Sequence, residues 1–200
     1  MDAPFLSDEL PYARSEQVET AIARVLAFNP SPYTFTGTQT YVVGEDRLAI
    51  IDPGPDDDDH IAAIIKAIAG RPVVAICCTH THRDHSPAAS PLAQMTGAKI
   101  IGCAPLALAD VGIRADAAFD SSYQPDQILA DGEAIDLGQC RLVAVATPGH
   151  TSNHLCYAVD CGPSHGALFT GDHVMGWSTS VVIPPDGDMQ DYLASLEKLR

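Results

Sequence analysis

Hydrophobic and polar residues are arranged along the first half of the chain as they are when strands and helices alternate. Two short apolar runs within residues 38–51 flank the turn Gly44-Glu45-Asp46, and this spacing predicts a β-hairpin. Isoleucines at positions 61, 64, 65 and 68 form the i, i+3, i+4, i+7 stripe of an amphipathic helix that ends at Gly70. We expect a strand at residues 73–79, a helix at about 87–96 and a strand at 98–102 to follow.

The second half of the chain contains closely spaced apolar runs instead. Residues 141–147, 154–160 and 166–170 are joined by tight connections, which is typical of an antiparallel sheet. A last apolar stripe predicts a helix over residues 191–199, and the sequence stops there without a cap. We therefore expect an α/β fold with two sheets, helices outside them, and a C-terminal part that is cut off.

The composition is that of one globular domain. With 200 residues, 46% of them hydrophobic, the chain can bury a sizeable core, and we expect a single domain over residues 1–200. We find neither a signal peptide nor an apolar run long enough to span a membrane, so we expect a cytoplasmic protein with no membrane contact. The net charge of −15, with only 11 scattered Lys and Arg residues, argues against a broad nucleic-acid-binding surface.

The cysteines lie mostly inside or at the ends of the predicted strands. They occupy positions 77, 78, 103, 140, 156 and 161, and none forms a C-x-x-C pair. We therefore expect buried, reduced thiols rather than disulfides or metal ligands.

Potential metal ligands are concentrated in the run His80-Thr81-His82-Arg83-Asp84-His85, directly after the predicted strand at 73–79. Side chains at i and i+2 of an extended chain leave the backbone on the same side, so His80, His82 and Asp84 can converge on one point. His85 is out of phase with that set and can turn towards a second point if the chain begins to coil there. Because four potential ligands fall within six residues, metal binding is favoured over structural histidines.

Two further candidate ligands also lie just beyond predicted strand ends. His150 belongs to the loop Thr147-Pro148-Gly149-His150-Thr151, and Asp172 follows the strand at 166–170. A glycine precedes each of them, as expected where the chain must turn sharply to present a side chain. Three strand ends could therefore share one cleft.

The chemistry of these side chains favours a pair of zinc ions. Neutral imidazoles suit a three-ligand site with an open position for water, and a carboxylate can bridge two ions roughly 3.5–4 Å apart. A water between the ions, with a pKa of about 7, would supply hydroxide, and Asp84 could accept its proton and orient it as the catalytic carboxylate. The expected first site consists of His80, His82 and His150, the second of Asp84 and His85, and the bridge is Asp172.

In this order, the motifs resemble those of the metallo-β-lactamase-fold hydrolases. The resemblance covers about residues 35–180 and rests on His80-x-His82-x-Asp84-His85, the 147–151 loop, Gly171-Asp172 and Ile50-Ile51-Asp52-Pro53-Gly54. Within that superfamily, Asn29-Pro30-Ser31-Pro32, Gly37-Thr38-x-Thr40-Tyr41 and the segment 171–177 are similar to the LACTB2-like branch. The resemblance implies a four-layer αβ/βα sandwich, a dinuclear zinc site along one edge, and hydrolysis of an ester, thioester, amide or phosphodiester bond.

The resemblance also bears on residues beside the ligands. It implies that Asp52 supports the ligands through hydrogen bonds, whereas His154 either supports ligands or substrate or is purely structural. Family members carry another metal-binding histidine after the Asp172 motif, but no histidine follows His173 here. We therefore expect a truncated chain or a second site that lacks one ligand. Residues 177–185 either shape a substrate wall or form an ordered surface loop.

We expect a zinc-dependent hydrolase that acts on a small-molecule or short polymer substrate. The alternatives are a LACTB2-like single-strand endoribonuclease, a hydroxyacylglutathione hydrolase-like thioesterase, and a mono-iron dioxygenase or non-catalytic metal-binding protein. The acidic balance predicts that the chain alone would hold RNA poorly, and the lack of a signal peptide argues against β-lactam hydrolysis. An iron oxygenase predicts that His85 is not a ligand.

Overall fold

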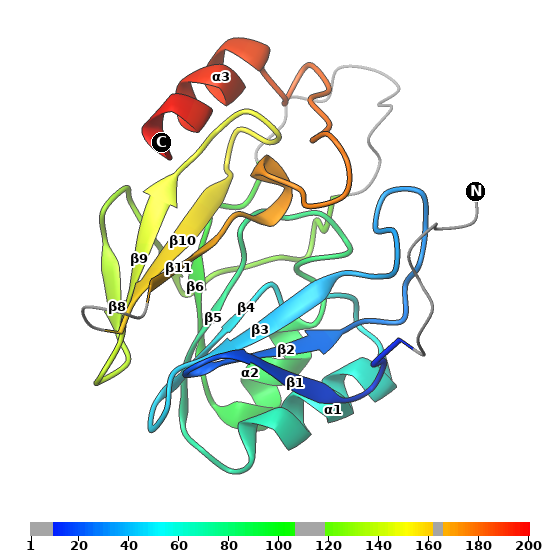
Figure 1. Cartoon of the computed structure of the whole chain (residues 1–200), viewed down its shortest axis with the longest axis vertical. Helices are drawn as coiled ribbons and strands as arrows, with labels where there is room; N and C mark the ends of the chain where they lie inside the picture. Colours follow the sequence, from blue (N-terminus) through cyan, green and yellow to red (C-terminus); the bar gives the residue numbers. More distant parts are fainter. Residues whose placement is uncertain (1–9, 107–118, 162–165) are drawn as a thin grey trace.

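Two β-sheets face each other in the computed structural model, which describes residues 10–106, 119–161 and 166–200 (Figure 1). The larger sheet has the strand order β1 (Ser15–Glu19), β2 (Ile22–Leu26), β3 (Gln39–Val43), β4 (Leu48–Ile51), β5 (Val73–Cys77), β6 (Lys99–Gly102) and β7 (Gln127–Ile128). Neighbouring strands are antiparallel from β1 to β4 and parallel from β4 to β7. The smaller sheet is antiparallel, in the order β11 (Gly166–Phe169), β10 (Leu155–Asp160), β9 (Arg141–Ala146) and β8 (Ala134–Asp136).

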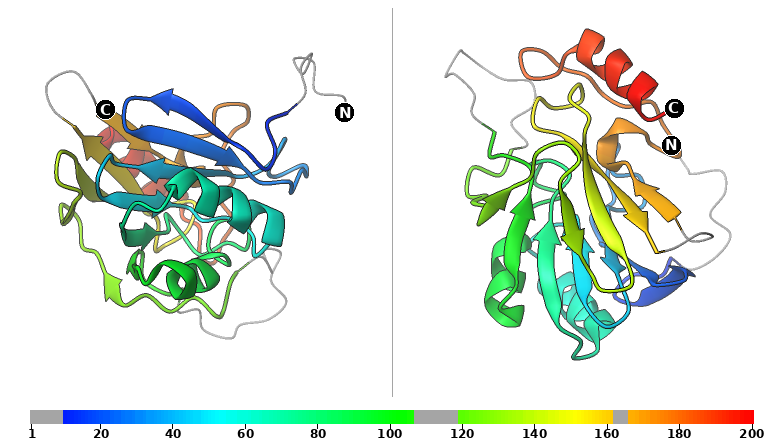
Figure 2. Two further views of the ribbon diagram at one scale, coloured as in Figure 1. Left: turned by 90° about the horizontal axis from the view of Figure 1, so that it is seen from below. Right: turned by 90° about the vertical axis from the view of Figure 1, so that its left-hand side faces the viewer.

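Helices α1 (Asp58–Ile68) and α2 (Ala89–Thr96) pack on the outer side of the larger sheet (Figure 2). The Asp57 side chain caps α1 by accepting a hydrogen bond from the backbone N of His60 at 2.9 Å. The helix ends at Ile68 with Ala69 as its C-cap, just before the predicted glycine, and its isoleucine stripe packs into the core with only Ile65 partly exposed. The predicted hairpin and the strand and helix order after it are therefore confirmed. No helix in the described ranges has the length and apolar character needed to cross a bilayer.

Helix α3 (Met189–Lys198) lies at the end of the smaller sheet, next to the loops that leave β9 and β11 (Figure 1). Ser195 Oγ of α3 donates a hydrogen bond to the Pro148 carbonyl at 2.8 Å. The backbone of α3 also comes so close to Gly149 that a Cβ there would lie 2.4 Å from Tyr192 Cα. The mixed sheets with outer helices confirm the predicted sandwich, and α3 fixes the loop that carries His150.

The sequence pattern does not predict β1 and β2. Four of the five β1 residues are exposed, and this edge strand is rich in Ser, Glu and Gln, so it carries no apolar stripe. Its position comes from pairing with β2, which in turn pairs with β3. Such pairing depends on the register of distant segments, which single-strand patterns do not encode.

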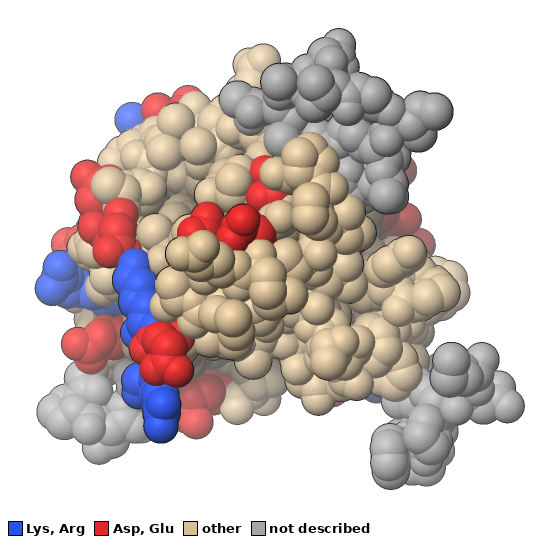
Figure 3. Space-filling view, turned by 90° about the horizontal axis from the view of Figure 1, so that it is seen from above, with Lys and Arg blue, Asp and Glu red and all other residues tan. Residues whose placement is uncertain are grey.

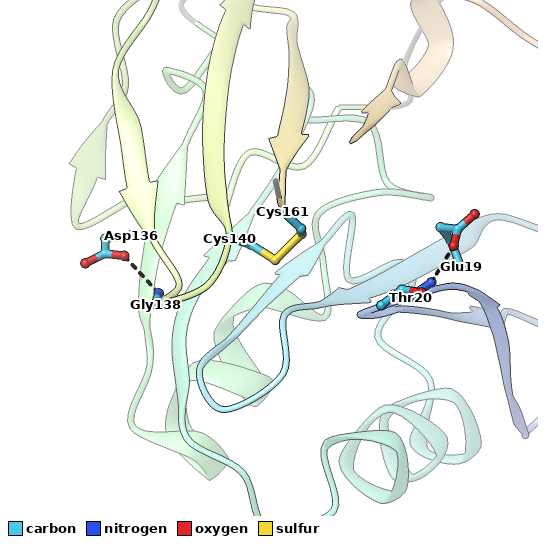
Figure 4. Close-up of a disulfide and its surroundings, with 6 residues drawn as sticks. All are labelled: Glu19, Thr20, Asp136, Gly138, Cys140 and Cys161. Carbon is cyan, nitrogen blue, oxygen red and sulfur yellow. Dashed lines mark hydrogen bonds between the residues drawn. A yellow bond between two sulfur atoms is a disulfide. The ribbon is translucent and has the colours of Figure 1, made fainter. Parts of the chain in front are cut away.

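The expectation that all six cysteines are reduced is wrong at two positions. Cys140 and Cys161 form a disulfide (Figure 4), whereas the cysteines at 77, 78, 103 and 156 are free and buried as expected. Arg141 pairs with Asp160 at the matching ends of β9 and β10, so the next residues outward face each other with their Cα atoms 4.1 Å apart. This pairing follows from the strand register rather than from cysteine spacing along the chain.

Candidate metal centre

The three loops predicted to carry ligands meet below α3 at one end of the two sheets (Figure 1). His82 Nδ1 lies 2.9 Å from His80 Nε2 and 3.1 Å from His150 Nε2. Asp172, in the short 3-10 turn η1 (Gly171–His173), places Oδ2 3.6 Å from His150 Nε2 and 3.9 Å from His80 Nε2. The four donor atoms all lie within 4.8 Å of one another, so the structure brings together the predicted first site and the predicted bridge.

The rings of His80, His82 and His150 each direct one nitrogen towards a common point. His150 Nδ1 donates a hydrogen bond to the Val181 carbonyl at 2.6 Å, which leaves Nε2 facing the group. Burial and then the charge of His85 lower the pKa of His80 well below its ordinary value, and burial and His150 lower the pKa of His82 to about 4. The rings of His80 and His82 are therefore neutral at pH 7, which is the form that binds zinc. Without a metal ion, His82 Nδ1 can donate a hydrogen bond to one of the two facing nitrogens. With its proton on Nε2 instead, three ring nitrogens and a carboxylate oxygen converge on one point, and this set of donors fits a divalent metal ion.

A second group of donors adjoins the first and shares Asp172 with it. His85 Nε2 lies 3.4 Å from Asp84 Oδ2 and 3.3 Å from Asp172 Oδ1. Although burial opposes the change, Asp84 and Asp172 raise the pKa of His85 well above its ordinary value. Burial likewise opposes the effect of His85 on Asp172, yet the His85 charge holds the pKa of that carboxyl low. Two carboxylates that face one imidazole thus require a positive charge, which either a proton or a metal ion can supply.

Asp52 lies behind the second group, just beyond the end of β4. Its Oδ2 accepts hydrogen bonds from His85 Nδ1 at 3.0 Å and from Thr79 Oγ1 at 2.9 Å, while Oδ1 accepts one from the Thr79 backbone N at 2.7 Å. The carboxylate is 5% exposed, and neither group of candidate ligands contains it. The hydrogen bond at Nδ1 leaves His85 Nε2 free to face Asp84 and Asp172.

His154 and His173 are buried beside the first group and outside it. The His154 ring stacks on His80 with 5.2 Å between centroids, and its Nδ1 lies 2.9 Å from Thr147 Oγ1. Its Nε2 and both nitrogens of His173 are buried without a hydrogen-bond partner in the described chain. His173 packs against Tyr192 of α3 with 4.6 Å between centroids. Neither histidine joins the Asp84, His85 and Asp172 group, which has no fourth ligand among the described residues.

An open cleft of about 610 Å³ leads to both groups of candidate ligands. Its lining includes the candidate ligands His82, Asp84, His150 and Asp172, and also residues 177–179, Val181 and Ile183. The sequence allows residues 177–185 to form either a substrate wall or a surface loop, and the structure places residues 177–179, Val181 and Ile183 in the cleft lining. A second hollow of about 550 Å³ lies on the side of Asp84 and Asp172 that faces β2 and β11. Figure 3 views this end of the molecule, where uncharged residues dominate and Lys and Arg gather at one side.

Sequence reasoning missed the contact that fixes this wall to the candidate ligands. Asp186 is only 6% exposed and accepts hydrogen bonds from Ser152 Oγ at 2.6 Å and from the Ser152 backbone N at 3.3 Å. It thereby ties the segment that contains Val181 to the loop that contains His150. The sequence offers one signal for this contact. Asp186 lies between an apolar run with two prolines and Gly187, a setting in which a carboxylate can be buried if it is hydrogen-bonded.

Comparison with known proteins bears on both the fold and the chemistry. The family model described as the Metallo-beta-lactamase superfamily matches residues 33–200. The chain is 28% identical over 191 residues to an atrochrysone carboxyl ACP thioesterase of Passalora fulva, covering 92% of this chain and 51% of that protein. It is also 28% identical over 189 residues to a beta-lactamase-like protein 2 homolog of Caenorhabditis elegans, covering 92% and 59%.

Among solved structures, ETHE1 from Myxococcus xanthus superimposes with a TM-score of 0.63 at 21% identity, covering 89% of this chain and 68% of that one. This similarity confirms the fold, and the Caenorhabditis elegans relative supports the resemblance to the LACTB2-like branch. The chain spans about half the length of the curated relatives it matches.

Proposed function

The chain belongs to the metallo-beta-lactamase superfamily, and on that premise we propose that it is a zinc-dependent hydrolase of thioester or ester bonds. The observation that carries the proposal is that Asp172 is shared between two groups of donor atoms, one formed with three imidazoles and the other with Asp84 and His85. Bound at these two groups, zinc ions would acidify a water molecule and polarise the carbonyl of the substrate.

In this proposal each residue has one role. His80, His82, His150 and Asp172 would hold one ion, and Asp84, His85 and Asp172 the other. Asp84 takes a proton from the attacking water and is oriented by Thr38, whose Oγ1 donates a hydrogen bond to Asp84 Oδ2 at 3.5 Å. The water oxygen forms a bond to the carbonyl carbon, the carbon–sulfur or carbon–oxygen bond breaks, and the thiol or alcohol leaves with the proton from Asp84.

A small acyl substrate is favoured over RNA for two reasons. The Passalora fulva relative is named as a thioesterase, and the lining of the cleft includes Trp177, Val181 and Ile183, which suit an apolar group. Proteins that bind single-stranded RNA normally use several Lys and Arg side chains together with aromatic residues on which the nucleobases stack. Among the described lining residues of this cleft, Arg83 is the one Lys or Arg.

The test combines metal analysis with a panel of thioester, ester and phosphodiester substrates. We expect two zinc ions per chain and hydrolysis of thioesters or esters that stops when a chelator removes the zinc. Asp172→Asn should reduce zinc content and turnover together, whereas Asp46→Asn, at an exposed turn remote from both groups, should change neither. One iron per chain with thiol-dependent oxygen uptake would refute the proposal, as would bound zinc without turnover on any substrate.

A further inference from the structure

The cleft that leads to the candidate ligands contains a cation whose role the proposed reaction leaves unexplained. Arg83 lies between His82 and Asp84 in the sequence, and all three line the 610 Å³ cleft. The described lining residues of this cleft and of the adjoining hollow include no other Lys or Arg. In a chain with a net charge of −15 and only 11 Lys and Arg residues, an arginine beside the candidate ligands is an unusual feature.

Among the described residues, the guanidinium of Arg83 is held at one point only. Its Nε donates a hydrogen bond to the Phe119 carbonyl at 3.1 Å, which fixes the plane of the group. Within the described chain, Arg83 has no ion pair, and its two terminal nitrogens make no hydrogen bond. An arginine that is exposed yet oriented through Nε presents the pair of terminal N–H groups that binds a carboxylate in bidentate fashion.

Apolar side chains line the same cleft and form what we call the Trp177 wall. Trp177 stacks on Phe35 with 4.8 Å between ring centroids and 20° between planes, and it is still 46% exposed. Val181, 38% exposed, extends this wall, and its carbonyl holds His150 as described above. The cleft therefore offers an oriented cation beside the candidate ligands, and apolar side chains in the same lining.

We propose that Arg83 binds a carboxylate of the substrate while the Trp177 wall packs against its apolar part, so that the substrate class is a small acyl thioester or ester with a single carboxylate. This inference rests on the proposed function for the bond that is cleaved, whereas the binding of the carboxylate is argued from Arg83 and the cleft alone. Arg83 is a specificity-determining residue in this arrangement and takes no part in proton transfer.

Binding can be measured without turnover, because Trp177 is the only tryptophan of the chain. Nitroaromatic compounds quench tryptophan fluorescence, so the probes are 4-nitrobenzoate and its neutral isostere 4-nitrobenzamide, titrated into zinc-loaded protein. We expect the wild-type protein to bind the carboxylate about tenfold more tightly than the amide, the ratio typical of a charged hydrogen-bonded pair. Arg83→Met should remove this preference, and Arg83→Lys should keep only part of it.

Arg47→Met is the matched control for the loss of one positive charge, since Arg47 is exposed, lines neither cavity and pairs with Asp136 at 3.8 Å. It should retain the full preference for the carboxylate. A preference that persists unchanged in Arg83→Met overturns the inference and assigns the carboxylate to the metal ions. Equal binding of both probes by the wild-type protein also overturns it. Zinc content and binding of the neutral probe should stay unchanged in Arg83→Met, which excludes damage to the neighbouring ligands.

Turnover separates this inference from the proposed function. Two pairs of thioesters serve as substrates, each with one carboxylate and its neutral amide counterpart, placed in the leaving thiol in one pair and in the acyl part in the other. In at least one pair, Arg83→Met should raise KM for the acid about tenfold with little change in kcat, and leave the amide unaffected. Hydrolysis of all four substrates without any effect of Arg83→Met refutes the role of Arg83 and leaves the hydrolase standing. Hydrolysis of none refutes the proposed function itself.

Discussion

Exchanging Asp52 for asparagine tests whether the second group of donors depends on one buried hydrogen bond. Asp52 has a φ of +49°, a conformation that asparagine tolerates well, so Asp52→Asn changes the chemistry of the side chain with little backbone strain. The carboxylate accepts three hydrogen bonds, from two Thr79 donors and from His85 Nδ1. An amide offers one acceptor oxygen and one NH2 group, so it cannot accept all three.

The expected effect on the second zinc site follows from that mismatch. If the amide oxygen keeps the Thr79 backbone bond, its NH2 group faces His85 Nδ1, and His85 must move its proton to Nε2 to accept the bond. The nitrogen that faces Asp84 and Asp172 is then protonated and cannot bind a metal ion. Loss of such a supporting contact costs about 10–100-fold in metal affinity, or roughly 1.4–2.7 kcal/mol.

Zinc stoichiometry at controlled free zinc, with chelator competition for each site, measures the effect. The wild-type protein should bind two ions and Asp52→Asn one, with the affinity of the first site within about twofold of wild type. Asp126→Asn is a suitable control, because Asp126 also accepts a backbone hydrogen bond, from Ile100 N at 2.8 Å, but contacts neither group. Two sites of wild-type affinity in Asp52→Asn would refute the tautomer argument, and equal loss of both sites would show that Asp52 only holds the strand ends.

Three further predictions concern the supports around the site. Asp186→Ala should release the wall that fixes His150 and lower first-site zinc affinity about tenfold in chelator competition, whereas unchanged affinity would contradict the anchoring role. Cys140→Ser should lower the free energy of unfolding by about 3 kcal/mol, because the disulfide closes a loop with a sequence separation of 21, and zinc binding below the Tm should not change. Gly149→Ala should destabilise by about 1–3 kcal/mol in chemical denaturation, because a Cβ there meets the α3 backbone at 2.4 Å; Gly132→Ala, with no heavy atom within 4 Å, should cost less.

The fold and the candidate ligands could be predicted because both follow from local pattern. A buried strand followed by His80-x-His82 fixes the side of the chain on which these rings lie, whatever the rest of the fold does. The Cys140–Cys161 disulfide and the β1–β2 pair could not be predicted, since each depends on the register between strands. The Val181 carbonyl that orients His150 was equally inaccessible, because a backbone carbonyl leaves no trace in the residue type.

The position of Asp172 changes how the apparent shortage of ligands in the second group should be judged. The sequence predicts a second site of Asp84 and His85 with Asp172 as the bridge, and the family resemblance leads us to expect one more histidine after His173. Because Asp172 directs Oδ1 at His85 and Oδ2 at His80 and His150, the second group already has three protein donors. Catalytic zinc sites commonly use three protein ligands and leave the remaining position for water or substrate, whereas structural sites use four. A three-donor second group is therefore complete enough for chemistry, and its stability rests on the hydrogen bond that Asp52 accepts from His85.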